Sequence, residues 1–272
     1  MIRTAWPHDL PGLRELFALA NDAPYDLAAV TEEKCFGLGI DGPPVVRIYE
    51  IADRIIAAAV HCGRFLRILT VARDHRRRGI GSALVTDAED HGTSVIAAEP
   101  GNYFTPGVSM EDPGIRAFFH ACGYIETRWT WNLDVPLAGL PPGTGVIRPT
   151  YEDADRVLDF IERDFGRIWR FEAAKAFERD VPMMFIAEDE GAIVGFAAHD
   201  VNNRGLGFFG PTGVSASMRG KGIGCRLLLA SLSDLHHLGY DRAVIPWTDA
   251  LDFYRKCCGA EPAHRFVAFA RK

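Results

Sequence analysis

The sequence contains one short glycine- and arginine-rich pattern twice, and this repeat constrains the fold more than any other feature. The segment Arg76–Gly81 reads RRRGIG, and the segment Arg219–Gly224 reads RGKGIG. The two halves also open alike, because Ile2–Asp9 resembles Ile147–Asp153. Self-similarity of this kind indicates two copies of one structural unit in tandem.

An aromatic pair before a glycine closes each copy: Phe118–Phe119 precedes Gly123, and Phe253–Tyr254 precedes Gly259. Between the copies, Pro136–Gly145 is so rich in proline and glycine that it cannot sustain a helix or a central strand. The 272 residues also suffice for two domains. The sequence therefore predicts a first domain over 1–135, a linker over 136–145 and a second domain over 146–272.

Hydrophobic periodicity gives the two copies the same order of elements. In the first copy it predicts helices over 10–20, 80–91 and 114–121, and strands over 45–51, 55–62, 65–71, 95–99 and 127–133. In the second copy it predicts helices over 154–165, 223–238 and 249–257, and strands over 185–187, 193–198, 206–214, 243–247 and 265–270. Several strands precede each central helix, so we expect an α/β fold with a mixed, mostly antiparallel sheet flanked by helices in each domain.

Composition excludes several classes of partner. The net charge of −6 argues against nucleic acid. No apolar run approaches the roughly 20 residues that span a bilayer, and no secretory signal is visible. The six cysteines form no C-x-x-C pair, and the nine histidines show no metal-ligand spacing. We therefore expect a cytoplasmic protein, a monomer or a homodimer, without a metal.

In both copies the glycine-rich pattern stands between a predicted strand and a predicted helix. The N-terminus of a helix presents unpaired N–H groups and favours anions, glycines allow a ligand to approach the backbone, and the basic residues add charge. This combination predicts a pyrophosphate site. The sequence lacks the G-x-x-x-x-G-K-[ST] pattern of a P-loop and the third glycine of a Rossmann fingerprint.

The segments Val71–Gly81 and Val214–Gly224 resemble the acyl-coenzyme A loop of the GNAT superfamily of N-acetyltransferases, in which a strand-end valine precedes [QR]-x-x-G-x-[GA] and a helix. The segment Ala250–Tyr254 resembles the later A-x-x-F-Y segment of that superfamily. The resemblance covers nearly the whole chain as two tandem copies, an arrangement also known from mycothiol synthase.

The resemblance implies acetyl-coenzyme A as cosubstrate and assigns roles to particular residues. The backbone of Val71 or Val214 would pair with the pantetheine arm, and Tyr254 would protonate the departing thiolate. The remaining cofactor-binding residues implied are Arg76, Arg77, Arg78, Gly79, Ile80 and Gly81 in the first copy and Arg219, Gly220, Lys221, Gly222, Ile223 and Gly224 in the second.

The base that deprotonates the amine has no motif. An amine with a pKa of about 10.4 is mostly protonated at pH 7, so a carboxylate near the acceptor would help. Our candidate is Asp249, which follows the strand expected to flank the acyl group, although it could equally be a helix N-cap. Glu188, Asp200 and Asp252 stand at comparable strand ends or helix starts.

The two copies differ at the aromatic pair. The first copy has Phe118 and Phe119 and therefore no hydroxyl there, so we expect its domain to be non-catalytic unless Tyr103 or His120 substitutes. Tyr254 stands five residues before Gly259, whereas the family spacing is four, which suggests a one-residue insertion.

These observations favour an acetyltransferase that acts on a primary amine of a small molecule by direct transfer. The acceptor pocket would include Phe165, Trp169, Phe171, Glu172 and Trp247. Two alternatives stay open: a non-enzymatic acyl-coenzyme A sensor or scaffold, and a protein N-acetyltransferase.

Overall fold

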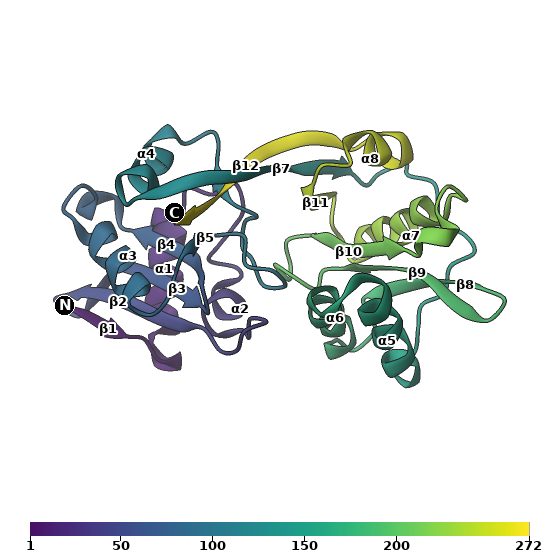
Figure 1. Ribbon diagram of the computed structural model, residues 1–272, viewed down its shortest axis with the longest axis horizontal. Coiled ribbons are helices and arrows are strands. Elements are labelled where there is room, and N and C mark those ends of the chain that lie inside the picture. Colours follow the sequence, from purple (N-terminus) through teal and green to yellow (C-terminus); the bar gives the residue numbers. More distant parts are fainter. Residues whose placement is uncertain (272) are drawn as a thin grey trace. The chain divides into compact units, whose positions relative to one another are not determined.

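A computed structural model describes residues 1–271, which divide into two compact units. Met1–Thr130 and the chain from His264 onward make the first unit, and Trp131–Ala263 makes the second. Each unit combines strands with covering helices, as the sequence predicts (Figure 1). Lys272, the last residue of the predicted second domain, lies outside the described residues.

The first unit is built on a mixed sheet with the strand order β1-β2-β3-β4-β5-β12. Strands β4 and β5 pair in parallel, and β6 pairs antiparallel with β12. Its strands are β1 (Ile2–Thr4), β2 (Val45–Ile51), β3 (Arg54–Cys62), β4 (Phe65–Val71), β5 (Val95–Ile96), β6 (Val108–Ser109), the start of β7 (Tyr124–Pro136) and most of β12 (Glu261–Arg271). Its helices are α1 (Leu10–Ala20), α2 (Thr31–Phe36), α3 (Ile80–Asp90) and α4 (Pro113–Ala121), with short 3₁₀ turns at Pro7–Asp9 and Arg73–His75.

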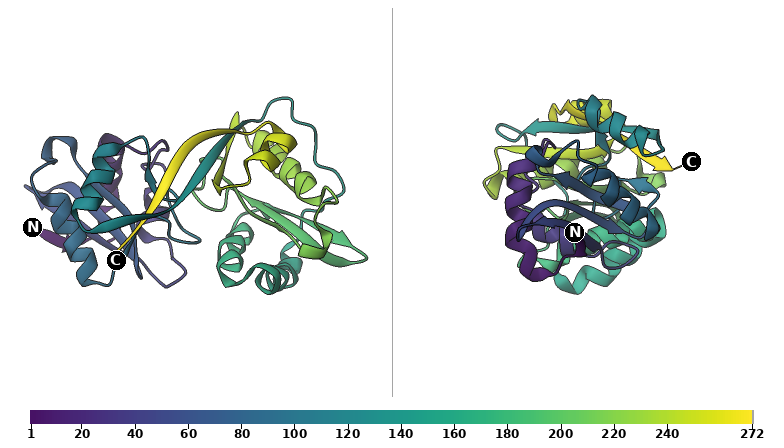
Figure 2. Two further views of the ribbon diagram at one scale, coloured as in Figure 1. Left: turned by 45° about the horizontal axis from the view of Figure 1, so that its top comes forward. Right: turned by 90° about the vertical axis from the view of Figure 1, so that its left-hand side faces the viewer.

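The centre of this sheet is buried on both faces. In β3 every residue from Ile55 to Cys62 is buried, which matches the unbroken apolar run Ile55–Val60. Helix α1 covers one face of β3 and β4, and α3 covers the other (Figures 1 and 2).

The second unit contains an antiparallel sheet with the order β10-β9-β8. Its strands are β8 (Met184–Asp189), β9 (Ala192–His199), β10 (Phe209–Val214) and β11 (Arg242–Thr248), the last of which pairs antiparallel with the end of β7. Its helices are α5 (Ala154–Phe165), α6 (Arg167–Ala174), α7 (Ile223–His237) and α8 (Leu251–Cys258), with 3₁₀ turns at Tyr151–Asp153, Lys175–Glu178 and Ala216–Met218.

Neighbouring residues of β9 enter two different hydrophobic clusters. Val194 and Ala197 pack in the cluster of α7, whereas Ile193, Phe196 and Ala198 pack in the cluster of α5 and α6. Because side chains alternate across a strand, α7 covers one face of this sheet and α5 with α6 covers the other (Figure 1).

The division into units differs from the expected domain boundaries at both ends of the second half. Trp131–Pro136, the end of β7, belongs to the second unit, where it pairs with β11. The chain from His264 onward returns to the first unit, where Phe269 pairs with Ile96 and Phe266 pairs with Ser109. Each unit is thus completed by a strand from the other half of the sequence.

The segment expected as a linker packs against the second unit. The N–H of Leu137 donates to the carbonyl of Asp241 at 3.0 Å, and Leu137 is buried. At Gly143 a Cβ would lie 2.2 Å from the carbonyl oxygen of Arg226 on α7, so only glycine permits this approach.

Most predicted elements lie within two or three residues of the observed ones, and α1, β2, β4 and α5 coincide with their predicted bounds. The strand predicted over 95–99 ends at Ile96, because Ala97 and Ala98 adopt positive φ angles of 55° and 54° that leave the strand conformation. No helix within residues 1–271 is both long and apolar enough to cross a bilayer.

Replacing Phe269 should destabilise the first unit, although the residue lies near the C-terminus. Its side chain is fully buried and contacts the ring of Phe119 at a centroid distance of 5.8 Å. Phe269→Ala should cost about 3–5 kcal/mol, because it leaves a cavity. Hydrogen exchange should accelerate in β4 and β5 and stay unchanged in α7. Ile125→Ala, at a position that is 39% exposed, is the control and should cost less than about 1 kcal/mol; loss of protection confined to α7 would contradict the assignment.

Candidate functional site

Two loops, one joining β4 to α3 and one joining β10 to α7, adopt nearly the same backbone. Arg76 has φ −67° and ψ 159°, and Arg219 has φ −65° and ψ 156°. Gly79 has φ 80° and ψ −5°, and Gly222 has φ 75° and ψ 2°. The repeat in the sequence is therefore also a repeat in conformation.

Both loops end at a glycine N-cap that leaves the helix start open. Gly79 and Gly222 occupy the left-handed region, and no side chain caps α3 or α7. The first N–H groups of each helix therefore lack a side-chain acceptor, which is the arrangement that binds anions. A Cβ at either glycine would meet no heavy atom of the described residues within 4 Å, apart from the adjoining chain.

The loops differ at one strained position. Gly220 has a φ of 80°, whereas its counterpart Arg77 has a φ of 63°. A left-handed conformation costs a residue with a Cβ roughly 1–2 kcal/mol and costs glycine little. The second loop therefore adopts the shared conformation with less strain.

The charges of the two loops have different partners. Asp22 accepts ion pairs from Arg73 at 2.9 Å and from Arg76 at 2.5 Å, so two cations of the first loop share one negative charge. Arg219 and Lys221 are exposed, and within residues 1–271 no carboxylate lies within 4 Å of either. In the first loop, Arg77 and Arg78 are exposed as well, and no carboxylate of the described residues lies within 4 Å of either, so both loops present positive charge to a ligand.

Beside the second loop, the parallel strands β10 and β11 meet at one point and then separate. They share a parallel bridge at Phe208 and Val244, and the N–H of Val244 donates to the carbonyl of Gly207 at 2.9 Å. The pairing of β11 with β7 shifts register after Ile245, and Trp247 there has a φ of 51°. We call the space between the separating strands the second fork.

The side chain of Asn132 supports this separation. Its amide oxygen accepts the N–H of Trp247 at 2.9 Å, which replaces a ladder hydrogen bond lost at the register shift. Since β10 is the edge strand of its sheet, its other edge has no continuous partner strand, and the carbonyl of Val214 accepts Nε of Arg219 at 3.3 Å. Sequence reasoning missed Asn132, because it lies in the first half of the chain.

The position of Tyr254 follows from the packing of its neighbour. A Cβ at Gly224 would lie 3.4 Å from the ring of Phe253, and a Cβ at Gly81 would lie 3.4 Å from the ring of Phe118. Phe253 and Phe118 are therefore equivalent, so Tyr254 occupies the register of Phe119. The extra residue of the second copy accordingly lies between Tyr254 and the glycine that ends α8.

Tyr254 is buried beside the start of β10. The ring stands edge-on to Phe209 at 6.4 Å and to Phe253 at 4.9 Å, and 8% of the residue is exposed. Burial, with a smaller contribution from Cys258 and Cys257, raises the pKa of Tyr254 to about 12. The phenol is therefore protonated at neutral pH and able to donate a hydrogen bond.

Asp249 is exposed and stands between β11 and α8. The N-cap of α8 is Ala250, whose N–H donates to the hydroxyl of Thr248 at 3.0 Å.

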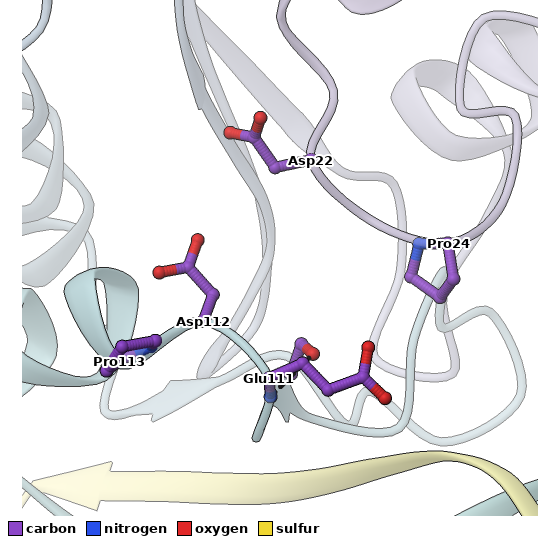
Figure 3. Close-up of a pocket in the computed structure, with 6 residues that line it drawn as sticks. Asp22, Pro24, Glu111, Asp112 and Pro113 are labelled. Atoms are coloured by element: carbon purple, nitrogen blue, oxygen red, sulfur yellow. Dashed lines mark hydrogen bonds between the residues drawn. The ribbon is translucent and has the colours of Figure 1, made fainter.

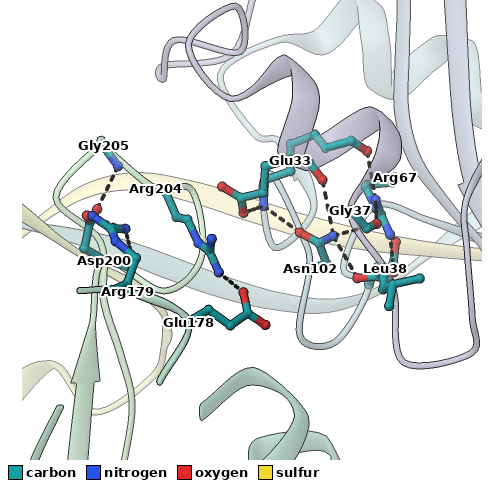
Figure 4. Close-up of polar contacts among 12 residues, drawn as sticks. Glu33, Gly37, Leu38, Arg67, Asn102, Glu178, Arg179, Asp200, Arg204 and Gly205 are labelled. Atoms are coloured by element: carbon teal, nitrogen blue, oxygen red, sulfur yellow. Dashed lines mark hydrogen bonds and ion pairs between the residues drawn. The ribbon is translucent and has the colours of Figure 1, made fainter. Parts of the chain in front are cut away.

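The other carboxylates that the sequence put forward are engaged elsewhere or exposed. Glu188 pairs with Arg156 at 2.8 Å. Asp200 accepts the N–H of Gly205 at 2.8 Å and pairs with Arg179 (Figure 4), and burial raises its pKa. The Asp252 side chain is fully exposed.

An aromatic wall covers the opposite face of β10. A Cβ at Gly213 would lie 2.5 Å from the ring of Phe165, so this ring packs directly on the strand backbone. Trp169 stacks on Phe165 at 5.3 Å, and both rings contact Phe196. Glu172 is buried on the same helix as Trp169. The ring of Phe171 on α6 lies under the ammonium group of Lys175. Four residues expected near the acceptor thus lie on or next to α6: Phe165, Trp169, Phe171 and Glu172.

In the first unit, the corresponding fork between β4 and β5 holds buried charges. Arg67 on β4 pairs through two nitrogens with Glu99, at 2.6 and 2.7 Å. Its third nitrogen donates to the carbonyls of Lys34 and Gly37. Asn102 donates to Gly37 as well, and Figure 4 shows Arg67 and Asn102 converging on that segment.

A hollow of about 320 Å³ lies in the first unit close to the first loop (Figure 3). Asp22, Glu111 and Asp112 line it. Two of these carboxylates already have partners, because Asp22 holds the loop arginines and Asp112 accepts the N–H of Ile115 to cap α4. Across the described part of the chain, no cluster of three or more metal-ligating side chains occurs.

Comparison with known proteins gives consistent matches. The family model "Acetyltransferase (GNAT) family" matches residues 149–260. A mycothiol acetyltransferase of Mycolicibacterium vanbaalenii is 30% identical over 233 residues, which cover 74% of this chain and 73% of that protein. A mycothiol acetyltransferase of Clavibacter sepedonicus is 26% identical over 280 residues, covering 92% of this chain and 90% of the relative.

A solved structure shares the fold of the whole chain. It is a tandem GNAT protein from the clavulanic acid biosynthesis pathway, with a TM-score of 0.68 and 18% identity. The match covers 99% of this chain and 97% of that one.

Proposed function

Since the chain belongs to the GNAT family of acetyltransferases, we propose that its second unit transfers an acetyl group from acetyl-coenzyme A to the primary amine of a small molecule. The observation that carries the proposal is the juxtaposition, within one unit, of the loop before α7, the second fork and Tyr254. The first unit would keep the loop without the catalytic hydroxyl.

The second loop fits the pyrophosphate of coenzyme A. The N–H groups from Arg219 to Gly224 would bind its oxygens, with Arg219 and Lys221 supplying positive charge. The pantetheine arm would pair with the edge of β10 at Val214. Bound there, acetyl-coenzyme A supplies the thioester as the acetyl donor.

The amine must lose a proton before it attacks. At pH 7 this costs roughly 4–5 kcal/mol for an amine with a pKa of about 10.4. Asp249 is the proposed base, acting directly or through a water molecule. The neutral nitrogen then attacks the thioester carbonyl, the carbon–sulfur bond breaks, and the thiolate departs. The nitrogen loses its second proton as the amide forms, and this proton replaces the one that the general acid gives up.

Tyr254 would donate its phenolic proton to that thiolate. A pKa of about 12 keeps the proton on Tyr254 until the thiolate forms. A thiolate whose conjugate thiol has a pKa of about 8.5 in water is a poor acceptor for it. Desolvation in the fork would raise the pKa of the thiol as well, which would narrow the difference between the pKa values of the thiol and the phenol.

The relatives favour a small molecule over a protein as acceptor, because the curated relatives are named for mycothiol. The aromatic wall of Phe165 and Trp169 offers apolar faces to such an acceptor. In the first unit, His120 is bonded to Glu126 at 3.2 Å, a contact that would compete with a role as proton donor. That unit alone would act as a non-enzymatic coenzyme A-binding module.

The six cysteines are free thiols, which supports a reducing cytoplasm as the compartment.

An acceptor screen tests the function. Acetyl-coenzyme A is incubated with a panel of small primary amines, including amino sugars and deacetylated mycothiol, while free thiol is measured and the acetylated amine is identified by mass. We expect thiol release that depends on one class of amine. Thiol release independent of every amine would contradict the proposal.

Blocking the second loop should abolish turnover, whereas blocking the first should not. Gly222→Val places a branched side chain in the open space before α7, so the rate at saturating amine should fall by about a hundredfold or more. Gly79→Val, the matched control at a similar φ, should stay within about twofold because it blocks the loop of the unit that would lack the catalytic hydroxyl. The measurement is the steady-state rate of each variant at saturating amine. A larger loss of rate in Gly79→Val than in Gly222→Val would assign catalysis to the first unit.

Tyr254→Phe should lower kcat by roughly 10²–10⁴ while coenzyme A binding barely changes, because only the proton donor is removed. In the wild type, a donor with a pKa of about 12 stays protonated, so kcat should not fall between pH 8 and 10. Rates across this range, with Phe253→Leu as a packing control, check both points. An unchanged kcat in Tyr254→Phe would leave the residue a packing role only.

Asp249→Asn should lower kcat/KM by about 10²-fold, since the amide cannot accept the amine proton. The loss should shrink at high pH, where more of the amine is already neutral. Asp252→Asn, three residues further and fully exposed, should leave the rate unchanged. Equal rates for the two variants across pH would exclude Asp249 as the base.

A further inference from the structure

The two forks can be compared residue by residue, because their registers coincide. Phe65 pairs in parallel with Val95 in the first unit, as Phe208 does with Val244 in the second. Counting along the strands from these pairs, Arg67 corresponds to Gly210. By the same count, Glu99 corresponds to Thr248.

In the first unit, this position is filled by a buried ion pair. The side chain of Arg67 is 0% exposed and that of Glu99 is 1% exposed. The two side chains join β4 to the segment that follows β5, so they lie across the fork.

The pair is also covered from the side of α2. A Cβ at Gly39 would lie 2.1 Å from Glu99 and 2.5 Å from the sulfur of Cys62, so the backbone there packs directly on the carboxylate. Lys34, itself fully buried, donates to Asn102 at 2.9 Å and supplies its carbonyl to Arg67. Opening this fork would strip Arg67 of four hydrogen bonds, which is costly for a buried guanidinium.

In the second unit, the same position is open. Gly210 carries no side chain, and a Cβ there would meet no described heavy atom within 4 Å beyond its neighbours in the chain. The φ of 122° at Gly210 also disfavours any other residue. The two forks thus differ in occupancy at one defined point, while the loops next to them agree in conformation.

We infer that Arg67 and Glu99 set the ligand specificity of the first unit, by filling the place where the acyl end of the pantetheine arm would lie. The first unit then gains no affinity from the thioester arm, whatever its loop binds. Its inactivity follows from the closed fork as well as from Phe119. This inference rests on the proposed function, since it takes coenzyme A as the ligand of the loops.

The test compares two ligands in two single-loop proteins by calorimetric titration. Gly222→Val leaves the first unit to bind, and Gly79→Val leaves the second. With Gly79→Val, acetyl-coenzyme A should bind at least about tenfold tighter than adenosine 3′,5′-bisphosphate, which lacks the arm. With Gly222→Val, acetyl-coenzyme A should bind no more than about threefold tighter than the bisphosphate. Undetectable binding of both ligands to this protein would also agree with the inference. An equal preference for acetyl-coenzyme A in both proteins would overturn the inference.

Two further variants in the Gly222→Val background test the cause. Arg67→Gly with Glu99→Thr installs the residues of the second fork and should raise acetyl-coenzyme A affinity by about tenfold, leaving the bisphosphate unchanged. Arg67→Met with Glu99→Leu removes the charges but keeps the volume, so it should give no gain. Melting temperatures confirm that each variant folds, and the apolar pair is expected to fold because its volume is conserved.

Should the opening variant fail to fold, Glu99→Thr with Arg67→Ala replaces it. No gain from an opened and folded variant, or an equal gain from the apolar pair, would overturn the inference. Loss of acetyl-coenzyme A binding in Gly79→Val alone would instead remove the proposed function, and this inference with it.

Discussion

The antiparallel pairing of β11 with Trp131–Pro136 is the interaction on which the second unit depends. It supplies β11 with a partner strand and leaves its other edge to meet β10 only at Phe208. The register shift in this pairing, with Asn132 holding the N–H of Trp247, turns β11 away from β10. The second fork therefore exists because a strand from the first half of the sequence fixes β11 in a bent course.

The comparison of the two units separates what a phosphate loop needs from what acetyl transfer needs. The loop conformation survives in both copies, even where Arg77 must adopt a positive φ. The forks have diverged: one holds the buried pair of Arg67 and Glu99, and the other holds Gly210. A loop needs only backbone geometry and charge, whereas the proposed chemistry needs an empty space beside a buried hydroxyl.

Much of the fold and part of the candidate site could be predicted from local patterns. The strand–loop–helix segments, the glycine caps and the helix that carries Tyr254 are short-range features, and they follow from periodicity and turn chemistry. The partners of Asp249 and the other carboxylates could not be predicted, because ion pairs such as that of Glu188 with Arg156 join residues far apart in the chain. The spacing anomaly before Gly259 was visible in the sequence, but only the packing of Phe253 on Gly224 showed on which side of Tyr254 the extra residue lies.

The sequence by itself determined that the chain is a tandem repeat with two phosphate-type loops, because a loop conformation is encoded by the glycines and the strand and helix that flank it. The tertiary structure decided which strand completes which unit, and which fork is filled. These outcomes depend on pairing between distant segments, such as Phe269 with Ile96, and on whether a buried arginine meets its carboxylate. Neither leaves a periodic signal, since backbone hydrogen bonds between strands do not depend on side-chain identity and a single buried ion pair has no pattern along the chain.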